Sequence, residues 1–471
     1  MKNLLAFLFC VLFSINHLAA QKDFITAPYL QIGYAGNPKA LSLLWHSADT
    51  TSNWKVEVKT KNNWINSKNI YFNKVIIKGY TPFFVYHAAL ENLENGIDFT
   101  YRVIENKKIV FESIAHAPKA KNQNYKFVVI GDIGALTKNQ KKLANIMYDI
   151  NPDFVAVPGD IVYNSGLIKD YANKFWPIYN ADKNDSSGAP LMRKIPFFAS
   201  VGNHDANDRD MDKTPDALSY YYFWEQPLNG PDYKEGSALV PMLKGSAANR
   251  NAFYTAAQKA YPKMTTYSYD YGNAHWTVID ADYYVDWTNT ALQEWVKQDL
   301  KKAEGAQWRF VLFHQPGFNS SKVHYEEQHM RLLSPIFEEG KVDVVFNGHV
   351  HNYQRSFPLT FKPDTTKKEQ ATNDIKKYKD KQINGNWVLD KSFDGSNNKK
   401  PKGVIYIVTG AGGQDLYNPE QTNLPNTWQP FTDKFFSTDH SLSAVVVEKN
   451  KFIFKQITST GKVVDSFTIV K

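Results

Sequence analysis

Five short apolar segments of this chain end directly in polar residues of the types that bind metal ions. The five ends are Gly131-Asp132, Gly159-Asp160 through Tyr163, Gly202-Asn203-His204-Asp205, Val311 through His314, and Gly348 through His351. In open α/β sheets, ligands bind beyond the carboxyl ends of the strands. We therefore expect these five segments, although spread over residues 132–351, to converge on one edge of a sheet.

The donor groups at these segment ends are too many for a single cation. They are three histidines, two aspartates, one asparagine and one tyrosine: Asp132, Asp160, Tyr163, Asn203, His314, His349 and His351. Two neighbouring cations need a bridging carboxylate, and oxygen and imidazole ligands without sulfur favour iron, zinc or manganese. Such a pair can hold both oxygens of a phosphoryl displacement. Each segment alone is compatible with a polar turn or helix cap, but the five together favour a binuclear site.

The chain divides into a strand-rich part and a mixed part. Residues 21–118 predict a small all-β sandwich, with strands at Leu41–Trp45, Lys55–Lys59, Lys74–Lys78, Phe83–Leu90 and Thr100–Ile104. Residues 125–471 alternate strands with helices, which predicts an α/β domain with a largely parallel core. Its expected helices are Lys138–Ile150, Ala291–Glu304 and Gln328–Glu339, and its expected strands are Lys126–Ile130, Phe154–Val157, Pro196–Val201, Trp276–Asp280, Arg309–Phe313, Val342–Phe346 and Val404–Val408. Two segments, 206–263 and 359–402, read as loop-rich insertions, the second of them solvated.

The first 20 residues predict export. Lys2 precedes an apolar run from Leu4 to Ile15, and small residues follow at Ala19 and Ala20, as in a secretory signal peptide. The alternative is a buried N-terminal helix. Export would leave the protein periplasmic or extracellular. No apolar run reaches the roughly 20 residues that span a bilayer, so we expect no integral membrane contact.

Composition narrows the chemistry further. Cys10 is the only cysteine and lies inside the apolar run, so disulfides, thiolate zinc sites and thiol catalysis are excluded from the exported chain. The formal charge of +8 would favour an anionic ligand, although an ordinary solvated surface explains it better. The lysine excess lacks interleaved aromatic residues, so we expect no nucleic-acid partner.

At these residues the chain resembles the calcineurin-like metallophosphoesterases, and the purple acid phosphatase branch most closely. The family motifs are present as Asp132-Ile133-Gly134, Gly159 to Tyr163, Gly202 to Asp205, Val311 to His314 and Gly348 to His351. The stretches Tyr267 to Asp280, Val408 to Gly413 and Gly461–Lys471 also match. Tyr86–Leu93 with Phe99–Val103 resembles the fibronectin-III-like domain that precedes such catalytic domains. The resemblance implies a β-sandwich core flanked by helices for residues 125–471.

The resemblance also implies roles for the individual residues. Asp132, Tyr163 and His351 would hold an Fe(III) ion, while Asn203, His314 and His349 would hold a divalent Fe, Zn or Mn, with Asp160 bridging the two. His204 would contact the phosphate or protonate the leaving group, and Asp205 would orient His204. His324 would act as a phosphate binder or general acid, with His329 a weaker candidate. The loop after His314 departs from the plant-type pattern, since it carries one histidine in place of a pair.

The resulting expectation is a secreted acid phosphatase that hydrolyses small phosphomonoesters with a metal-held hydroxide. A phosphodiesterase or nucleotide pyrophosphatase on the same metal core is the alternative. A non-catalytic surface binding protein is a further alternative, which the complete donor set disfavours.

Overall fold

The computed structural model describes residues 24–48, 51–60, 63–237, 239–364 and 383–471. The expected signal peptide at residues 1–20 lies outside these ranges. The strands expected at 41–45 and 83–90 are present as β2 (Leu41–Ser47) and β6 (Phe83–Leu90). The region from 26 to 116 is all-β, as predicted. No helix in the described part of the chain is long and apolar enough to cross a membrane.

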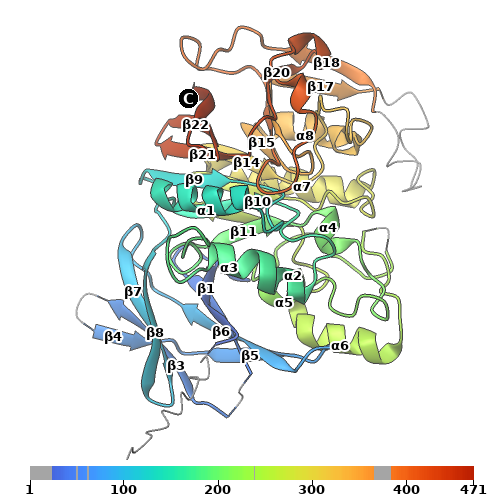
Figure 1. Ribbon diagram of the computed structural model, residues 1–471. Helices are drawn as coiled ribbons and strands as arrows, with labels where there is room; N and C mark the ends of the chain where they lie inside the picture. Colours follow the sequence, from blue (N-terminus) through green and yellow to red (C-terminus); the bar gives the residue numbers. More distant parts are fainter. Residues whose placement is uncertain (1–23, 49–50, 61–62, 238, 365–382) are drawn as a thin grey trace, which may run out of the picture.

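A ten-stranded sheet runs through the whole molecule and joins its two regions. Its spatial order is β23 (Val463–Val470), β22 (Lys451–Thr458), β21 (Ser441–Glu448), β9 (Tyr125–Val129), β10 (Phe154–Pro158), β11 (Phe197–Ser200), β1 (Thr26–Gln31), β2, β6 and β5 (Ile70–Val75). The junction is the parallel pairing of Gln31 with Phe197. The N-terminal strands therefore extend the sheet of the larger region. Figure 1 shows them in blue at the lower end of the molecule.

A four-stranded sheet completes the N-terminal sandwich. Its order is β4 (Asn63–Asn66), β3 (Trp54–Thr60), β7 (Asp98–Glu105) and β8 (Lys108–His116). Trp45 from the long sheet and Tyr101 and Val103 from the short one are fully buried between them. Because alternate side chains of a strand face opposite sides, one face of each sheet supplies this core. The fibronectin-III likeness of this region stays a prediction.

The larger region is a second sandwich, between the long sheet and a seven-stranded one. The latter has the order β12 (Tyr267–Tyr271), β13 (Ala274–Val278), β14 (Trp308–Leu312), β15 (Val344–Asn347), β19 (Ile405–Thr409), β16 (Tyr353–Ser356) and β20 (Thr432–Phe436). Aromatic rings fill the space between the sheets: the ring of Phe127 lies 5.2 Å from that of Trp276 and 5.8 Å from that of Phe310. The expected parallel core is present in both sheets, as β9-β10-β11 and β13-β14-β15-β19.

Helices cover the outer faces of this sandwich. α1 (Lys138–Ile150) begins where the Thr137 side chain accepts a hydrogen bond from the Gln140 amide, and it ends at Asn151 in the left-handed region. α7 (Thr290–Lys302) is capped by Asn289. It carries two lysines in its last turn, where their positive charges interact favourably with the helix dipole. Several other helices are short: α2 (Ile168–Asp170), α3 (Trp176–Tyr179), α4 (Asn203–Ala206), α5 (Tyr220–Phe223) and α8 (Ser334–Glu339). The helix expected over 328–339 is 3₁₀ at His329–Leu333 before α8 begins.

One expectation about this region is wrong, and the structure adds detail to two others. The metal-ligand residues follow strands of two sheets rather than one, because the two parallel cores belong to opposite layers of the sandwich. Segment 206–263 is loop-rich, as predicted, but it also contains α5, whose side chains are buried, and α6 (Ala247–Ala257). Segment 359–402 carries the hairpin β17 (Leu359–Pro363) and β18 (Gly385–Leu389), with Phe361 buried against the molecule. The solvated character expected for segment 359–402 is not tested for residues 365–382, which lie outside the described residues.

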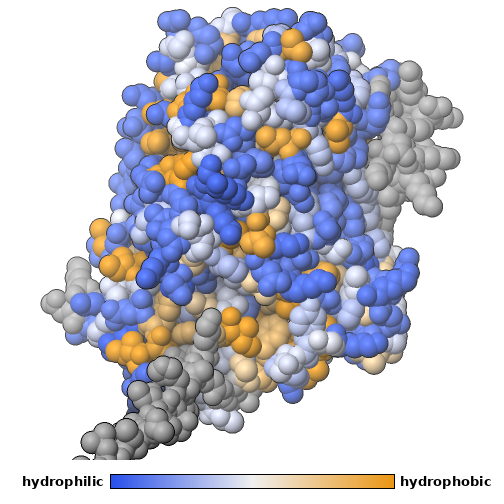
Figure 2. All heavy atoms as spheres, in the orientation of Figure 1, coloured by the Kyte–Doolittle hydropathy of each residue, from blue (hydrophilic) through white to orange (hydrophobic). Residues whose placement is uncertain are grey.

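The visible surface of the protein is mainly polar. Figure 2 shows a largely blue face with separate orange groups. Exposed apolar side chains include Ile65, Phe72 and Ile114 of the N-terminal strands. Scattered exposed apolar residues of this kind are normal and do not mark a site.

Candidate metal centre

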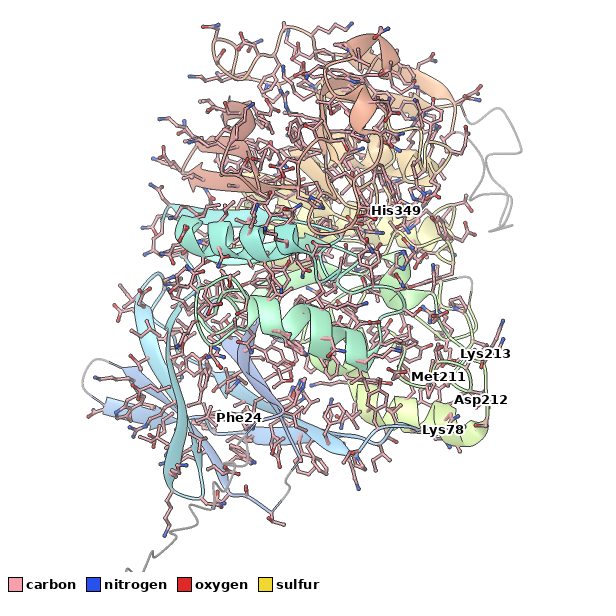
Figure 3. All side chains as sticks on the ribbon, in the orientation of Figure 1. Phe24, Lys78, Met211, Asp212, Lys213 and His349 are labelled. Carbon is pink, nitrogen blue, oxygen red and sulfur yellow. The ribbon has the colours of Figure 1, made fainter. Side chains whose placement is uncertain are left out.

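The carboxyl ends of the central strands bring the predicted donor residues together. Asp132 and Asp160 follow β9 and β10, Asn203 begins α4 after β11, and His314 and His349 follow β14 and β15. Figure 3 labels His349 in the upper part of the molecule, far from Phe24 in the N-terminal strands. The two sheets therefore meet at a common edge, and the donors lie between them.

The backbone at this edge adopts unusual conformations at three of the donor residues. Asp132, Asp160 and His349 adopt φ angles of 60°, 49° and 68°, in the left-handed region that side chains other than glycine rarely occupy. Residues in such conformations persist only where their surroundings hold them, and they concentrate at functional sites. Gly202 is required for space, because a Cβ there would collide with the Asp160 carboxylate.

One group of donors surrounds Asp160. The Nε2 atom of His314 lies 3.2 Å from Asp160 Oδ1 and 3.2 Å from Nδ1 of His349. All three residues are buried, and their donor atoms lie within 4.8 Å of one another. Asn203 is the adjoining predicted donor, and its Oδ1 is buried without a hydrogen-bond partner in the described structure. A buried unpaired acceptor is unusual in a protein, and a bound cation would satisfy it.

A second group surrounds Asp132. The hydroxyl of Tyr163 donates to Asp132 Oδ1 at 3.0 Å and lies 3.3 Å from Nε2 of His351. That nitrogen is itself 3.5 Å from Asp132 Oδ1. Burial, reinforced by Asp132 and Asp160, raises the pKa of the Tyr163 phenol well above its usual value. Without a metal, therefore, the phenol is neutral and acts as a donor.

Each of the three histidines has one ring nitrogen occupied and the other turned toward the donor groups. Nδ1 of His314 donates to the Pro158 carbonyl at 2.7 Å, and Nδ1 of His351 donates to the Asp415 carbonyl at 2.8 Å. Nε2 of His349 donates to Glu327 Oε2 at 2.7 Å. Such outer hydrogen bonds fix the ring and leave the opposite nitrogen free to bind a metal. The donor set thus fits cations of the iron, zinc or manganese type.

The charges of the metal-free site show the same design. Burial disfavours the charged form of His314, but Asp160 more than compensates and raises the pKa of His314 to about 10. Burial lowers the pKa of His349 to about 4, against the opposing effect of Glu327. At neutral pH the metal-free site therefore holds a charged His314 beside a neutral His349. The proton of His314 lies between His349 and Asp160, where a cation could bind in its place.

The predicted catalytic residues occupy different places. His204 is about one-third exposed, its Nδ1 donates to the Asn164 carbonyl at 2.6 Å, and its Nε2 faces Asp160 Oδ2 at 3.9 Å. His324 lies at the site, with its ring 4.0 Å from that of His349. His329 is fully buried, and its Nε2 donates to the Ala281 carbonyl, which turns it away from a catalytic role.

Asp205 does not orient His204 as expected. Its carboxylate accepts hydrogen bonds from the amides of Ile161 and Gly202, at 3.1 and 2.9 Å, and so ties the loop after β10 to the loop after β11. Burial, followed by repulsion from Asp160, raises the pKa of Asp205 to about 7. Asp205 therefore supports the backbone that carries Asp160.

Two residues at the site were not singled out from the sequence. Glu327 accepts from Nδ1 of His324 at 2.9 Å as well as from His349, and the hydroxyl of Tyr283 donates to it at 2.6 Å. The ring of Tyr417 stacks on that of His351. Neither follows a strand directly, so the signal that identified the other donors does not reach them. The spacing of His324 and Glu327, three residues apart, was the available hint.

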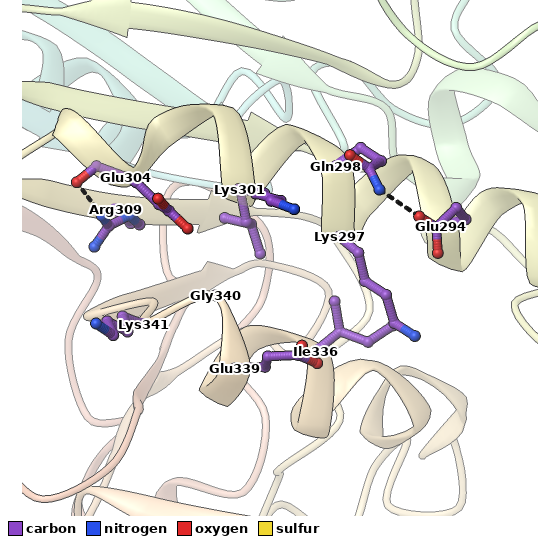
Figure 4. Close-up of a pocket in the computed structure, with 11 residues that line it drawn as sticks. Glu294, Lys297, Gln298, Lys301, Glu304, Arg309, Ile336, Glu339, Gly340 and Lys341 are labelled. Atoms are coloured by element: carbon purple, nitrogen blue, oxygen red, sulfur yellow. Dashed lines mark hydrogen bonds between the residues drawn. The ribbon is translucent and has the colours of Figure 1, made fainter.

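A large surface pocket lies elsewhere, between α7 and α8. It has a volume of about 660 Å³, and Figure 4 shows residues that line it, among them Lys297, Lys301, Glu339 and Arg309. Arg309 belongs to the start of β14, whereas His314 follows the end of that strand. The pocket is therefore at the opposite edge of the sheet from the donor residues. Its charges are of both signs, and Arg309 donates to the backbone carbonyls of Ala303 and Glu304.

Comparison with known proteins agrees with this geometry. The family model "Calcineurin-like phosphoesterase" matches residues 125–353, and "Iron/zinc purple acid phosphatase-like protein C" matches residues 403–466. Purple acid phosphatase 23 of Arabidopsis thaliana is 26% identical over 59% of this chain and 58% of its own length. Probable inactive purple acid phosphatase 27 of the same plant is 24% identical over 83% of this chain and 58% of its own length. The chain thus spans somewhat over half the length of these relatives.

A solved structure supports the fold. Purple acid phosphatase PPD1 from yellow lupin, Lupinus luteus, has a TM-score of 0.62 at 17% identity and covers 94% of this chain and 74% of its own. The two family models fall on the segments that carry the donors and the strands beside them. Residues 125–353 therefore match a calcineurin-like phosphoesterase domain and residues 403–466 a purple acid phosphatase-like C-terminal domain, families that imply a binuclear metal centre.

Proposed function

We propose that this chain is a metal-dependent phosphatase that hydrolyses small phosphomonoesters. The observation that carries the proposal is the pair of donor groups around Asp132 and Asp160. In these groups the ring nitrogens of His314 and His351 left free by outer hydrogen bonds face carboxylates, and that of His349 faces His314. In this proposal Asp132, Tyr163 and His351 hold one ion. Asn203, His314 and His349 hold the other, and Asp160 lies between them.

Two cations held there would lower the pKa of water and neutralise charge on the phosphoryl oxygens. The protein's own groups supply the rest. His204 has its Nδ1 occupied by a carbonyl, so its exposed Nε2 is the atom that can donate a proton to the leaving alkoxide. His324 lies on the other side of the site, beside His349, where it can contact the phosphate or the leaving group.

The ion beside Tyr163 is proposed to be Fe(III). A phenolate is a hard anionic ligand that suits a trivalent ion, and Tyr163 already contacts both Asp132 and His351. If two divalent ions bind instead, Tyr163 remains a packed neutral phenol. Loading with iron should therefore produce a visible charge-transfer colour that Tyr163→Phe removes.

The test of the proposed reaction compares two substrates on the purified chain. We would measure hydrolysis of p-nitrophenyl phosphate and bis-p-nitrophenyl phosphate from pH 4 to 9, after loading with iron, zinc or manganese. Preference for the monoester supports the proposal, and an acidic optimum would place it with acid phosphatases. Preference for the diester would show a phosphodiesterase on the same metal core. Hydrolysis of neither would support the non-catalytic reading, which a relative named as probably inactive makes worth testing.

We also propose that the protein is exported. The support is the sequence of residues 1–20, with its basic start, apolar run and small residues at 19 and 20. Sequencing the amino terminus of the protein recovered outside the cytoplasm should begin at Gln21. Recovery of the full chain from the cytoplasm would contradict export.

A further inference from the structure

Tyr417 covers one face of a predicted metal ligand. It lies in the loop between β19 and β20, two residues after Asp415, whose carbonyl accepts from His351 Nδ1. The rings of Tyr417 and His351 are nearly parallel, with centroids 4.1 Å apart and an interplanar angle of 13°. The same short segment therefore fixes both the edge and the face of the His351 imidazole.

The position of Tyr417 is held by its backbone. Its amide donates to the His351 carbonyl at 3.0 Å, and its carbonyl accepts from the Ser437 hydroxyl at 2.6 Å. A weaker bond at 3.4 Å joins that carbonyl to the Asn352 side chain. These contacts join the Tyr417 backbone to two segments of the chain and so fix the residue beside His351.

The Tyr417 ring also lies near His324, the predicted phosphate binder. The ring centroid lies 5.8 Å from that of His324, so Tyr417 spans the distance between His351 and the predicted phosphate binder. The carboxylates of Asp132 and Asp160 both act electrostatically on the phenol. The side chain is about half buried. Within the described residues its hydroxyl takes part in no hydrogen bond.

A hydroxyl in that position can donate a hydrogen bond to an oxygen atom of a bound ligand. His324, Tyr417 and His204 are partly exposed side chains beside the donor groups. Phosphoryl oxygens are strong acceptors. We propose that Tyr417 is a substrate-contacting residue, whose ring supports His351 and whose hydroxyl donates a hydrogen bond to a phosphoryl oxygen of the bound ester. This inference rests on the proposed phosphatase function.

The decisive variant is Tyr417→Phe, because it keeps the stacked ring and removes only the hydroxyl. We would measure the binding of inorganic phosphate to the metal-loaded full chain by calorimetry. The loss of one hydrogen bond to a charged group predicts about tenfold weaker phosphate binding. Metal content should equal that of the wild type. Equal phosphate affinity in the two proteins would overturn the inference.

Two further variants separate the hydroxyl from the ring. Tyr148→Phe makes the same change on α1, away from the site, and should leave phosphate affinity unchanged. Tyr417→Ala also removes the ring and should lower both metal retention and phosphate affinity. Loss of phosphate affinity only in Tyr417→Ala would assign the residue a supporting role and contradict the hydroxyl contact.

The result is distinguishable from failure of the proposed function. If the wild type binds phosphate but hydrolyses neither nitrophenyl substrate, the catalytic proposal fails, and the Tyr417 contact is still judged by calorimetry. If the wild type is active and Tyr417→Phe raises neither the KM nor the phosphate dissociation constant, the Tyr417 inference alone fails.

Discussion

The two ends of the seven-stranded sheet carry histidine and aspartate in contact, yet only one end is built as a site. Near the start of β13, His275 donates from Nδ1 to Asp270 at 2.7 Å and from Nε2 to Asp299 at 3.0 Å. Both of its nitrogens are occupied, and Asp299 also accepts from Thr277. At the carboxyl ends, His314, His349 and His351 each have one nitrogen occupied and one facing other donors. The unused bonding capacity, rather than the residue types, distinguishes a ligand set from a structural cluster.

The largest loss of activity is expected from substitution of a metal-ligand residue at the carboxyl ends of the strands, which we call the open end. Asp160→Asn or His314→Ala removes a group central to the Asp160 cluster, and its remaining members would no longer hold a cation. We expect hydrolysis of p-nitrophenyl phosphate to fall by a factor on the order of 10³ or more, since metal binding supplies several kcal/mol to such reactions. Metal content measured by atomic spectrometry should fall with it. Full activity in either folded variant would sink the site assignment.

A smaller loss of activity is expected when the hydrogen bond between Glu327 and His349 Nε2 is removed. Glu327→Ala frees His349 Nε2 and removes the partner of His324. Outer-shell changes of this kind cost about 10- to 100-fold in metal affinity or activity. Chelator competition would measure the loss. The neighbouring Glu326 is exposed, so Glu326→Ala is the matched control and should behave as wild type; equal behaviour of the two variants would remove Glu327 from the account.

Substitution of His275, at the end of the sheet where both ring nitrogens are occupied, should lower stability and leave activity unchanged. His275→Ala leaves two carboxylates without their shared partner, and we expect a loss of about 2 kcal/mol in the free energy of unfolding. Denaturant unfolding measures this change, while phosphate-ester hydrolysis per folded molecule stays unchanged. A loss of metal from this variant would show that the two ends are not independent.

The smallest effect is the pH dependence of that stability. Burial opposes charging of His275, but its bonds to Asp270 and Asp299 raise its pKa to about 9, above the usual 6.5. The stabilisation is therefore fully present below about pH 6.5 and is lost as pH rises through 9. The difference in unfolding free energy between wild type and His275→Ala should be larger at pH 6 than at pH 10. A difference that grows with pH would contradict the charged bridge.

The same comparison shows how far sequence reasoning reaches. Lys138–Ile150 was predicted to be a helix and is α1, because its capping residues and apolar spacing are local signals. The donors at strand ends were found for the same reason. Glu327 and Tyr417 were not, since they reach the site through loops whose path depends on tertiary packing. The division of the strands between two sheets, and the burial of Phe361, likewise depend on contacts distant in sequence.

The donor groups at the carboxyl ends of the strands should hold two cations. Isothermal titration calorimetry of the metal-free chain with zinc or manganese measures how many ions bind. We predict two ions bound per chain in the wild type and fewer than one in Asp160→Asn, with proton release because His314 must lose its proton. Binding of no ions by the wild type, or the same stoichiometry in Asp160→Asn, would contradict the account.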